Sequence, residues 1–140
     1  MDDIVIAGMG GETIAQILDD DPWVKQERIR LILQPMTRAQ YLRRYLFEQG
    51  FTIETELPVS DARHCYTVMA VRYTATPFIP DEALCYVGKL PLPAGEDYLS
   101  RIVTRLKKEQ AAHPQESVAT CLEKIESYRR GEWDPWREDA

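Results

Sequence analysis

The stretch IVIAGMGGETI, residues 4–14, decides the fold of this chain. Its first part runs from Ile4 to Ala7 and is apolar and mostly β-branched, which is the pattern of a strand buried on both faces. Glycines follow at positions 8, 10 and 11, and apolar residues then recur at helical spacing as far as Leu18. The stretch therefore predicts a buried strand that passes through a glycine-rich turn into a helix.

The next segment repeats this order of strand and helix. An apolar run at residues 29–33 ends in Gln34 and Pro35, as expected of a strand followed by a turn. Thr37 and Gln40 have the spacing of a capping box, and Gly50 stands where a helix commonly ends in a left-handed glycine. We therefore expect a second strand and then a helix over residues 37–50.

Two further strands complete the predicted sheet. Residues 51–57 alternate between apolar and polar, whereas residues 65–73 are mostly apolar, and a turn is expected near Ser60 and Asp61. Short connections between apolar strands and helices are typical of a parallel sheet with right-handed crossovers. The sequence thus predicts an α/β fold, with a parallel, helix-covered sheet that is finished by an antiparallel strand.

The character of the chain changes after residue 75. Prolines interrupt residues 76–95, which we interpret as a linker with a short helix. Narrow apolar stripes at helical spacing over residues 96–130 predict an antiparallel, coiled-coil-like helical hairpin. We expect residues 1–75 to form the α/β domain and residues 131–140 to form a loosely docked tail.

Composition limits the classes of protein that this chain can be. The 140 residues are 44% hydrophobic and 29% charged with a net charge of −6, which excludes wholesale disorder and a globally basic nucleic-acid binder. The three cysteines lack C-x-x-C spacing, which argues against a disulfide framework or a zinc site. No apolar run approaches the ~20 residues of a membrane helix, and the acidic start is unlike a secretory signal, so we expect a cytoplasmic protein.

The glycine-rich turn is the first place where chemistry is expected. It follows the carboxyl end of a strand, where open α/β sheets place ligands, and glycine lets a ligand approach the main chain closely. The dinucleotide fingerprint fails because Thr13 stands where it requires glycine, and Glu12 would repel a phosphate. The alternative, a tight turn without a ligand, carries equal weight on spacing alone.

Basic residues form the second feature. Arg38, Arg43 and Arg44 are expected to project from the second helix as part of a local basic patch. The simpler interpretation, a solvated helix face, is favoured by the net acidity of the chain. Arg101 and Arg105 add a basic flank to the first helix of the hairpin. We find no paired carboxylates, Ser-His-Asp arrangement or metal-ligand spacing.

Three segments in order carry a resemblance to a known family. Residues 4–14, RLILQPM at residues 30–36 and LRRYL at residues 42–46, followed by Gly50 and Phe51, resemble the bacterial TrmK family. Its members are S-adenosylmethionine-dependent methyltransferases that act on N1 of the adenine at tRNA position 22. The resemblance covers residue 1 to about residue 90 and implies a class I (Rossmann-like) methyltransferase sheet. Beyond that the likeness is to an architecture, since the family ends in a coiled-coil-like hairpin that helps to hold tRNA.

The resemblance also implies a departure from the family. The family's glycine-rich cofactor loop and its ribose-binding acidic residue precede the segment I-A-G-M-G-G. The chain therefore resembles the C-terminal half of the enzyme, without the main S-adenosylmethionine motif, and we expect it to be inactive alone. The strand at residues 4–7 would then have an open edge, through which we expect a homodimer or aggregation. The alternative is a noncatalytic RNA-binding or dimerisation module.

The resemblance further assigns residues to a methyl-transfer site. The reactive region comprises Gly8, Met9 and Gly10, and the cofactor contacts are Ala7, Gly8 and Gly11. The adenine N1 lone pair is already a nucleophile, so no general base is compulsory. Gln34, on the substrate side, could bind an adenine edge or order its own loop, and the second role is favoured. The expected tRNA contacts are Gln34, Pro35, Arg38, Arg43 and Arg44. No metal ion is expected.

Overall fold

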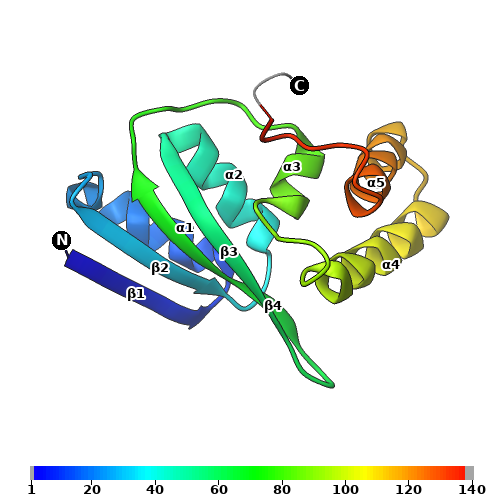
Figure 1. The fold of residues 1–140 in the computed structure, drawn as a ribbon, viewed down its shortest axis with the longest axis horizontal. Coiled ribbons are helices and arrows are strands. Elements are labelled where there is room, and N and C mark those ends of the chain that lie inside the picture. The colour runs from blue at the N-terminus through cyan, green and yellow to red at the C-terminus, as the bar shows by residue number, and fades with distance from the viewer. Residues whose placement is uncertain (1, 138–140) are drawn as a thin grey trace.

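The computed structural model describes residues 2–137, and a four-stranded sheet forms its centre (Figure 1). The strands are β1 (Asp2–Met9), β2 (Ile29–Pro35), β3 (Phe51–Ser60) and β4 (Cys65–Tyr73), in the spatial order β1-β2-β4-β3. β1 pairs with β2 in parallel, and β4 lies antiparallel to both β2 and β3. The α/β fold class and the predicted order of strands and helices are confirmed.

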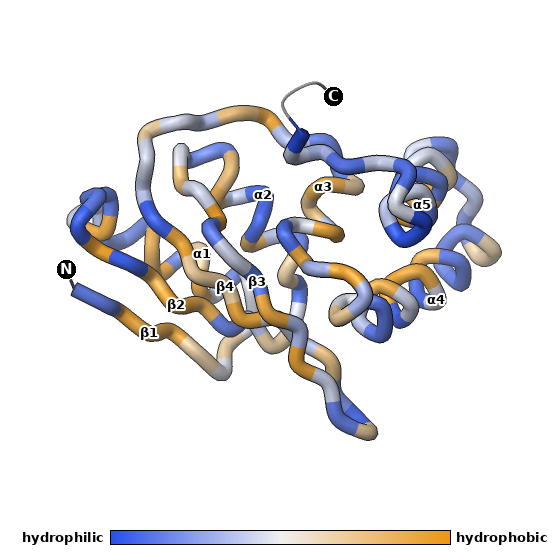
Figure 2. Tube along the Cα trace, viewed as in Figure 1, coloured by the Kyte–Doolittle hydropathy of each residue, from blue (hydrophilic) through white to orange (hydrophobic). Residues whose placement is uncertain are grey.

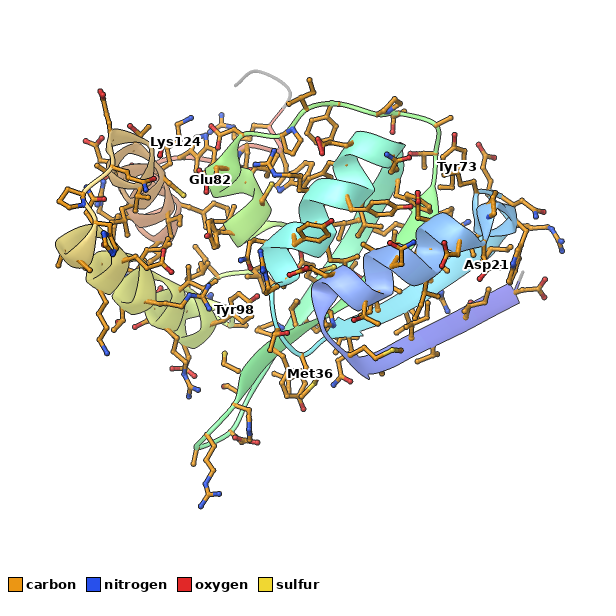
Figure 3. The ribbon with its side chains drawn as sticks, turned by 180° about the vertical axis from the view of Figure 1, so that it is seen from behind. Asp21, Met36, Tyr73, Glu82, Tyr98 and Lys124 are labelled. Carbon is orange, nitrogen blue, oxygen red and sulfur yellow. The ribbon has the colours of Figure 1, made fainter. Side chains whose placement is uncertain are left out.

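Helices α1 (Gly11–Asp20) and α2 (Ala39–Gln49) cover one face of this sheet, as the rear view shows (Figure 3). A short 3-10 helix, η1 (Pro22–Val24), follows α1. The core lies between the two helices and the sheet, where the side chains are less than 2% exposed. Its members include Ile14, Leu18, Leu31, Leu33, Leu42, Leu46, Met69 and Val71.

The prediction that the first strand is buried on both faces is wrong. In β1 the pattern alternates, because Ile4 and Ile6 are partly buried and pack against the core, whereas Val5 is 67% exposed. The register explains the alternation: Ile4 lies beside Leu31 on the helix-covered face and Val5 lies beside Ile32 on the other face. Figure 2 shows the hydrophobic stretch of β1 at the edge of the sheet. β1 pairs with one strand only among the described residues, so its outer edge is open.

Three more helices lie beside the sheet: α3 (Glu82–Val87), α4 (Glu96–Ala112) and α5 (Glu116–Arg129). Helices α4 and α5 form an antiparallel hairpin, and α3 packs against both α2 and α5. The apolar stripe of α4 is buried, as are two residues of α5. These residues are Tyr98, Leu99, Ile102, Val103, Leu106, Cys121 and Ile125. Within residues 2–137, no helix has the length and apolar character that crossing a membrane requires.

The tail is more firmly docked than the sequence suggested. The indole N–H of Trp136 donates to the carbonyl of Gly88 at 2.7 Å, and its ring lies 5.7 Å from that of Phe47. Lys89 stacks over the same indole at 4.7 Å. The expected tail also included residues 138–140, which lie outside the described residues. Residues 131–137 thus run back across α3 to the body of the molecule.

The start of α2 differs from the predicted capping box. Its N-cap is Arg38, which has a left-handed backbone with φ of 53°, and no side chain caps the helix. The end of α2 is as predicted: Gly50 has φ of 92° and its N–H donates to the carbonyls of Leu46 and Phe47. The predicted cap by Thr37 is therefore absent, and α2 begins instead from the left-handed backbone of Arg38.

Candidate functional site

The loops that follow β1 and β2 lie side by side. The Met36 N–H donates to the Met9 carbonyl at 2.8 Å, and the Gly11 N–H donates to the Thr37 carbonyl at 2.7 Å. This pairing follows from the parallel arrangement, because both strands end at the same edge of the sheet. The glycine-rich turn and the segment after β2 thus form one surface at the carboxyl edge.

Two of the three glycines in this turn are needed for the loops to pack. A Cβ on Gly11 would lie 2.2 Å from the carbonyl oxygen of Arg38, and one on Gly10 would lie 2.9 Å from Oγ1 of Thr37. Gly8 is different: its φ is +76°, it is exposed, and nothing lies within 4 Å of the Cβ position. The turn is therefore tight at Gly10 and Gly11 and open at Gly8.

An ion pair joins the two loops. Arg38 Nη1 lies 2.6 Å from Glu12 Oε1, and the Arg38 guanidinium lies 5.9 Å from the ring centre of Tyr41. Glu12 was expected to repel a bound phosphate, but its charge is offset here by Arg38. The left-handed backbone of Arg38 costs on the order of 1 kcal/mol and places this side chain beside Glu12.

A cavity of about 310 Å³ opens next to the loop after β2. We call it the arginine cavity. One wall is the segment of residues 35–40, the second is the tip of the β3–β4 hairpin, and the third is the first half of α4. Met36 and Tyr98, labelled in Figure 3, come from the first and third walls. The full lining is Pro35, Met36, Thr37, Arg38, Ala39, Gln40, Arg63, His64, Cys65, Tyr66, Tyr98, Arg101, Ile102 and Arg105.

The charge of this lining is one-sided. It holds four arginines, Arg38, Arg63, Arg101 and Arg105, and no carboxylate. Arg38 and Arg101 each have an acidic partner outside the lining, Glu12 and Asp97. Neither Arg63 nor Arg105 forms an ion pair within residues 2–137. The cavity is thus a local positive site on a chain whose net charge is −6.

The hairpin tip is held against α4 through its backbone. Arg101 Nη2 donates to the Asp61 carbonyl at 3.1 Å, and Asp61 Oδ1 accepts from the N–H groups of Arg63 and His64 at 2.8 and 2.7 Å. These two backbone hydrogen bonds lower the pKa of the exposed Asp61 carboxyl from its usual value. The tip that carries Arg63 and His64 is therefore ordered on the cavity side.

The structure separates the predicted substrate residues into three groups. Pro35 and Arg38 line the arginine cavity. Gln34 is half-buried in β2 opposite Ala7, and Arg44 is half-exposed on α2, outside the lining. Arg43 was expected on the basic patch, which is wrong, because its side chain is 0% exposed.

Arg43 instead forms a buried network. Its guanidinium donates to both carboxylate oxygens of Glu56 at 3.0 and 2.9 Å and to the carbonyls of Cys85 and Tyr86 at 2.8 and 3.0 Å. Burial alone would lower the pKa of Arg43, but Glu56 and Tyr98 outweigh it and raise the pKa. The residue therefore joins α2, β3 and α3 and has no surface for a substrate.

The predicted reactive and cofactor residues lie at the end of β1 and in the turn after it, which is hydrogen-bonded to the loop after β2 but does not itself line the cavity. Gly8 and Ala7 are exposed at the end of β1, and Met9 and Gly10 are half-buried. Gly11 is buried and its N–H is already bonded to Thr37, so that group is not available to a cofactor. Ala7 and Gly8 thus offer main chain to a ligand, whereas Gly11 shapes the turn.

Sequence reasoning missed much of the cavity. Arg101 and Arg105 were recognised as a basic helix flank, but Arg63, Tyr66 and Tyr98 were not connected with them. The i, i+4 spacing of Arg101 and Arg105 shows that they share a helix face, whereas their meeting with Arg63 depends on how the hairpin packs on α4. Cys65 also lines the cavity, and burial raises the pKa of its thiol, which disfavours a thiolate nucleophile. The described residues contain no group of three or more metal-ligating side chains.

Comparison with known sequences supports a methyltransferase relationship. A family model described as a methyltransferase domain matches residues 1–69. A Bacillus subtilis tRNA (adenine(22)-N(1))-methyltransferase is 37% identical over 68 residues, which are 49% of this chain and 29% of that protein.

Solved structures give the same relationship over almost the whole chain. A Streptococcus pneumoniae protein in complex with S-adenosyl-L-methionine matches with a TM-score of 0.58 and 28% identity, over 94% of this chain and 60% of that one. TrmK of M. capricolum, in complex with S-adenosyl-homocysteine, matches with a TM-score of 0.68 and 20% identity, over 93% of this chain and 60% of that one. The chain thus spans less than two thirds of the length of the relatives it matches.

Proposed function

We propose that this chain, which is a TrmK-family sequence, supplies the substrate-facing part of an S-adenosylmethionine-dependent tRNA (adenine-22, N1) methyltransferase. The loops at residues 8–11 and 35–38 would present the target adenine at the carboxyl edge of the sheet. The observation that carries the proposal is their position: hydrogen bonds join the two loops, and the second of them, at residues 35–38, lines the arginine cavity. The four arginines of the arginine cavity favour RNA as the ligand, because RNA carries negatively charged phosphates.

The chemistry needs positioning more than proton transfer. When bound, S-adenosylmethionine supplies an electrophilic methyl group. The adenine N1 lone pair attacks directly, so the protein needs to hold the base in line and to tolerate a cationic product. N1 is hidden in a Watson–Crick pair, which means that an unpaired or extruded adenine is the substrate form. The absence of a required base agrees with a site made of main chain, arginines and aromatic residues.

Three residues are proposed to act at the reacting centre. Gly8, Met9 and Gly10 form the turn next to the loop after β2, and the open space at Gly8 allows a ligand to approach the backbone. On the cofactor side, exposed Ala7 and Gly8 fit the edge of S-adenosylmethionine, and Gly11 does not. On the RNA side we propose Pro35 and Arg38, with Arg44 as an outer contact and Gln34 ordering its loop.

The helical hairpin and the cellular setting belong to the same proposal. Lys107 and Lys108 are exposed on α4 beyond the cavity, which supports a role of the hairpin in holding tRNA. The three cysteines are free thiols, as expected in the reducing cytoplasm, where tRNA is found.

A second proposal follows from the open edge of β1. Val5 is 67% exposed there, and an unpaired edge favours pairing with another strand. A homodimer through β1 would cover this edge, and a noncatalytic RNA-binding or dimerisation module is the alternative function. The noncatalytic module would differ from the methyltransferase by binding RNA without transferring a methyl group.

Isothermal titration of the chain with S-adenosylmethionine, and separately with a tRNA transcript, tests whether this chain binds the tRNA but not the cofactor. We expect the tRNA to bind and the cofactor to show no saturable binding at micromolar concentrations, because the one glycine-rich turn among the described residues uses the Gly11 N–H internally. Saturable cofactor binding would show that this chain holds the cofactor by itself. Failure to bind tRNA would contradict the proposed function.

A further inference from the structure

We propose that the arginine cavity binds a backbone phosphate of the RNA together with the nucleoside next to it, so that the chain grips the strand beside the target adenine. This inference rests on the proposed function and names its RNA contact. It assigns the contact to Arg63 and Arg105, two side chains that the sequence did not bring together.

The two arginines are available for an anion. Both are exposed, both line the cavity, and neither is in an ion pair within residues 2–137. Arg38 and Arg101, the other two cations of the lining, already have Glu12 and Asp97 as partners. A phosphate that enters the cavity therefore meets two uncompensated guanidinium groups, which bind phosphate oxygens through paired N–H donors.

The surroundings hold the backbone that carries these arginines in place before RNA binds. Arg63 lies on the hairpin tip, which is held by the hydrogen bond from Arg101 to the Asp61 carbonyl and by the Asp61 turn. Arg105 lies one helical turn after Arg101 on α4, so the hydrogen bond that fixes the tip also brings the two walls together. Less conformational entropy is lost on binding when the backbone that carries the donors is already ordered.

The rest of the lining fits a nucleoside better than a bare anion. Met36 and Tyr66 offer apolar and aromatic surface next to the arginines. Tyrosine rings and apolar side chains stack on bases, and every base has a face for stacking. The cavity volume of about 310 Å³ lies at the small end of the range of ligand pockets. The cavity also adjoins the loop of residues 35–38, so the bound nucleotide would be a near neighbour of the adenine presented there.

The test compares two double variants with the same change of charge. Arg63→Ala with Arg105→Ala removes the cavity cations, and Arg28→Ala with Arg130→Ala removes two exposed arginines elsewhere. Binding of a fluorescein-labelled tRNA transcript is measured by anisotropy over a range of KCl concentrations, and thermal unfolding checks that both variants are folded. A third double variant, Arg63→Lys with Arg105→Lys, keeps the charge of the cavity.

We expect the alanine variant of the cavity to bind tRNA about 10- to 100-fold more weakly and to lower the salt slope by about 0.7, which is the effect of one lost phosphate contact on a single strand. The control variant should bind within about 3-fold of the unmodified chain, and the lysine variant should keep most of the salt slope. Equal binding by the alanine variant and the control would overturn the inference and leave the proposed function intact. Failure of the unmodified chain to bind tRNA would instead contradict the proposed function.

A competition experiment separates RNA from a free nucleotide. Adenosine monophosphate carries the same phosphate and nucleoside but no neighbouring chain. We expect it not to displace the labelled tRNA at concentrations that leave the ionic strength unchanged. Displacement that is lost in the alanine variant of the cavity would identify a free nucleotide as the ligand and overturn the assignment to RNA.

Discussion

At the scale of single residues, burial decides which charged side chains serve the structure and which face a ligand. Arg43 and Arg44 are neighbours in sequence, yet Arg43 is 0% exposed and Arg44 is half-exposed. A helix turns by about 100° per residue, so adjacent arginines point in different directions. No pattern in the sequence indicates that Glu56, thirteen positions later, is the partner of Arg43. That pairing depends on how β3 packs against α2, and the spacing of residues within a helix gives no information about this packing.

The Arg43–Glu56 pair predicts a large effect on stability. Arg43→Met leaves Glu56 buried with its charge uncompensated, so we expect the free energy of unfolding to fall by about 3–5 kcal/mol in urea denaturation. The double variant Arg43→Met with Glu56→Leu removes both charges and should recover a substantial part of that loss. A single variant as stable as the unmodified chain would show that the pair does not hold these elements together.

Gly11 predicts a second effect at the residue scale. A methyl group at this position would lie 2.2 Å from the Arg38 carbonyl oxygen, so Gly11→Ala forces the two loops apart and should destabilise the chain by about 2–3 kcal/mol. Gly8→Ala is the matched control: it has open space and a strained backbone only, and should cost about 1 kcal/mol. Thermal unfolding measures both, and an equal cost would contradict the close approach at Gly11.

At the scale of elements, one long segment, residues 74–95, connects the sheet to the hairpin, whose helix α4 lines the arginine cavity. α3 is the main connection, and its N-cap is Asp81, whose carboxylate accepts from the N–H groups of Ala83 and Leu84. The same carboxylate pairs with Lys124 of α5. Asp81 therefore caps one helix and holds a second one.

Asp81→Ala removes both interactions and should lower the free energy of unfolding by about 1 kcal/mol, whereas Asp81→Asn keeps the cap and should cost less. Burial alone raises the pKa of Asp81, but the hydrogen bond from Lys124 and the capping N–H groups lower it overall, below 3.8. A depressed carboxyl pKa stabilises the fold above the unfolded value, and this contribution is lost as the pH falls through the folded pKa. The difference in stability between the unmodified chain and Asp81→Ala should thus shrink as the pH falls below 3.8 and through the lowered folded pKa; a constant difference would contradict the role of the charge.

At the scale of the whole molecule, the sequence predicted the sheet and its covering helices α1 and α2 better than it predicted the candidate site. Apolar periodicity and Gly50 were sufficient for the strands and for the end of α2, because local patterns determine them. The burial of β1 was misjudged because a strand covered by helices on one face and a strand covered on both faces can have the same apolar run. The arginine cavity could not be predicted, since Arg63 and Arg105 meet only through packing of the hairpin tip on α4.

The open edge of β1 makes a prediction about the whole molecule. We expect light scattering of the purified chain to give a dimer or a mass that rises with concentration, because the edge and exposed Val5 favour association. Val5→Lys places a charge on this exposed strand and should shift the population toward the monomer. Leu92→Lys, at an exposed position outside the sheet, is the control. A dilute, stable monomer for the unmodified chain would contradict association through β1.

We propose that this chain provides the tRNA-facing part of an adenine-22 N1 methyltransferase. The most direct measurement joins the chain to the remaining, cofactor-binding part of a relative and follows transfer of a labelled methyl group to two tRNA transcripts, one with adenine and one with guanine at position 22. We predict methylation of the adenine transcript alone, with the label at N1. A folded fusion that binds S-adenosylmethionine and tRNA but methylates neither transcript, or both equally, would contradict the claim.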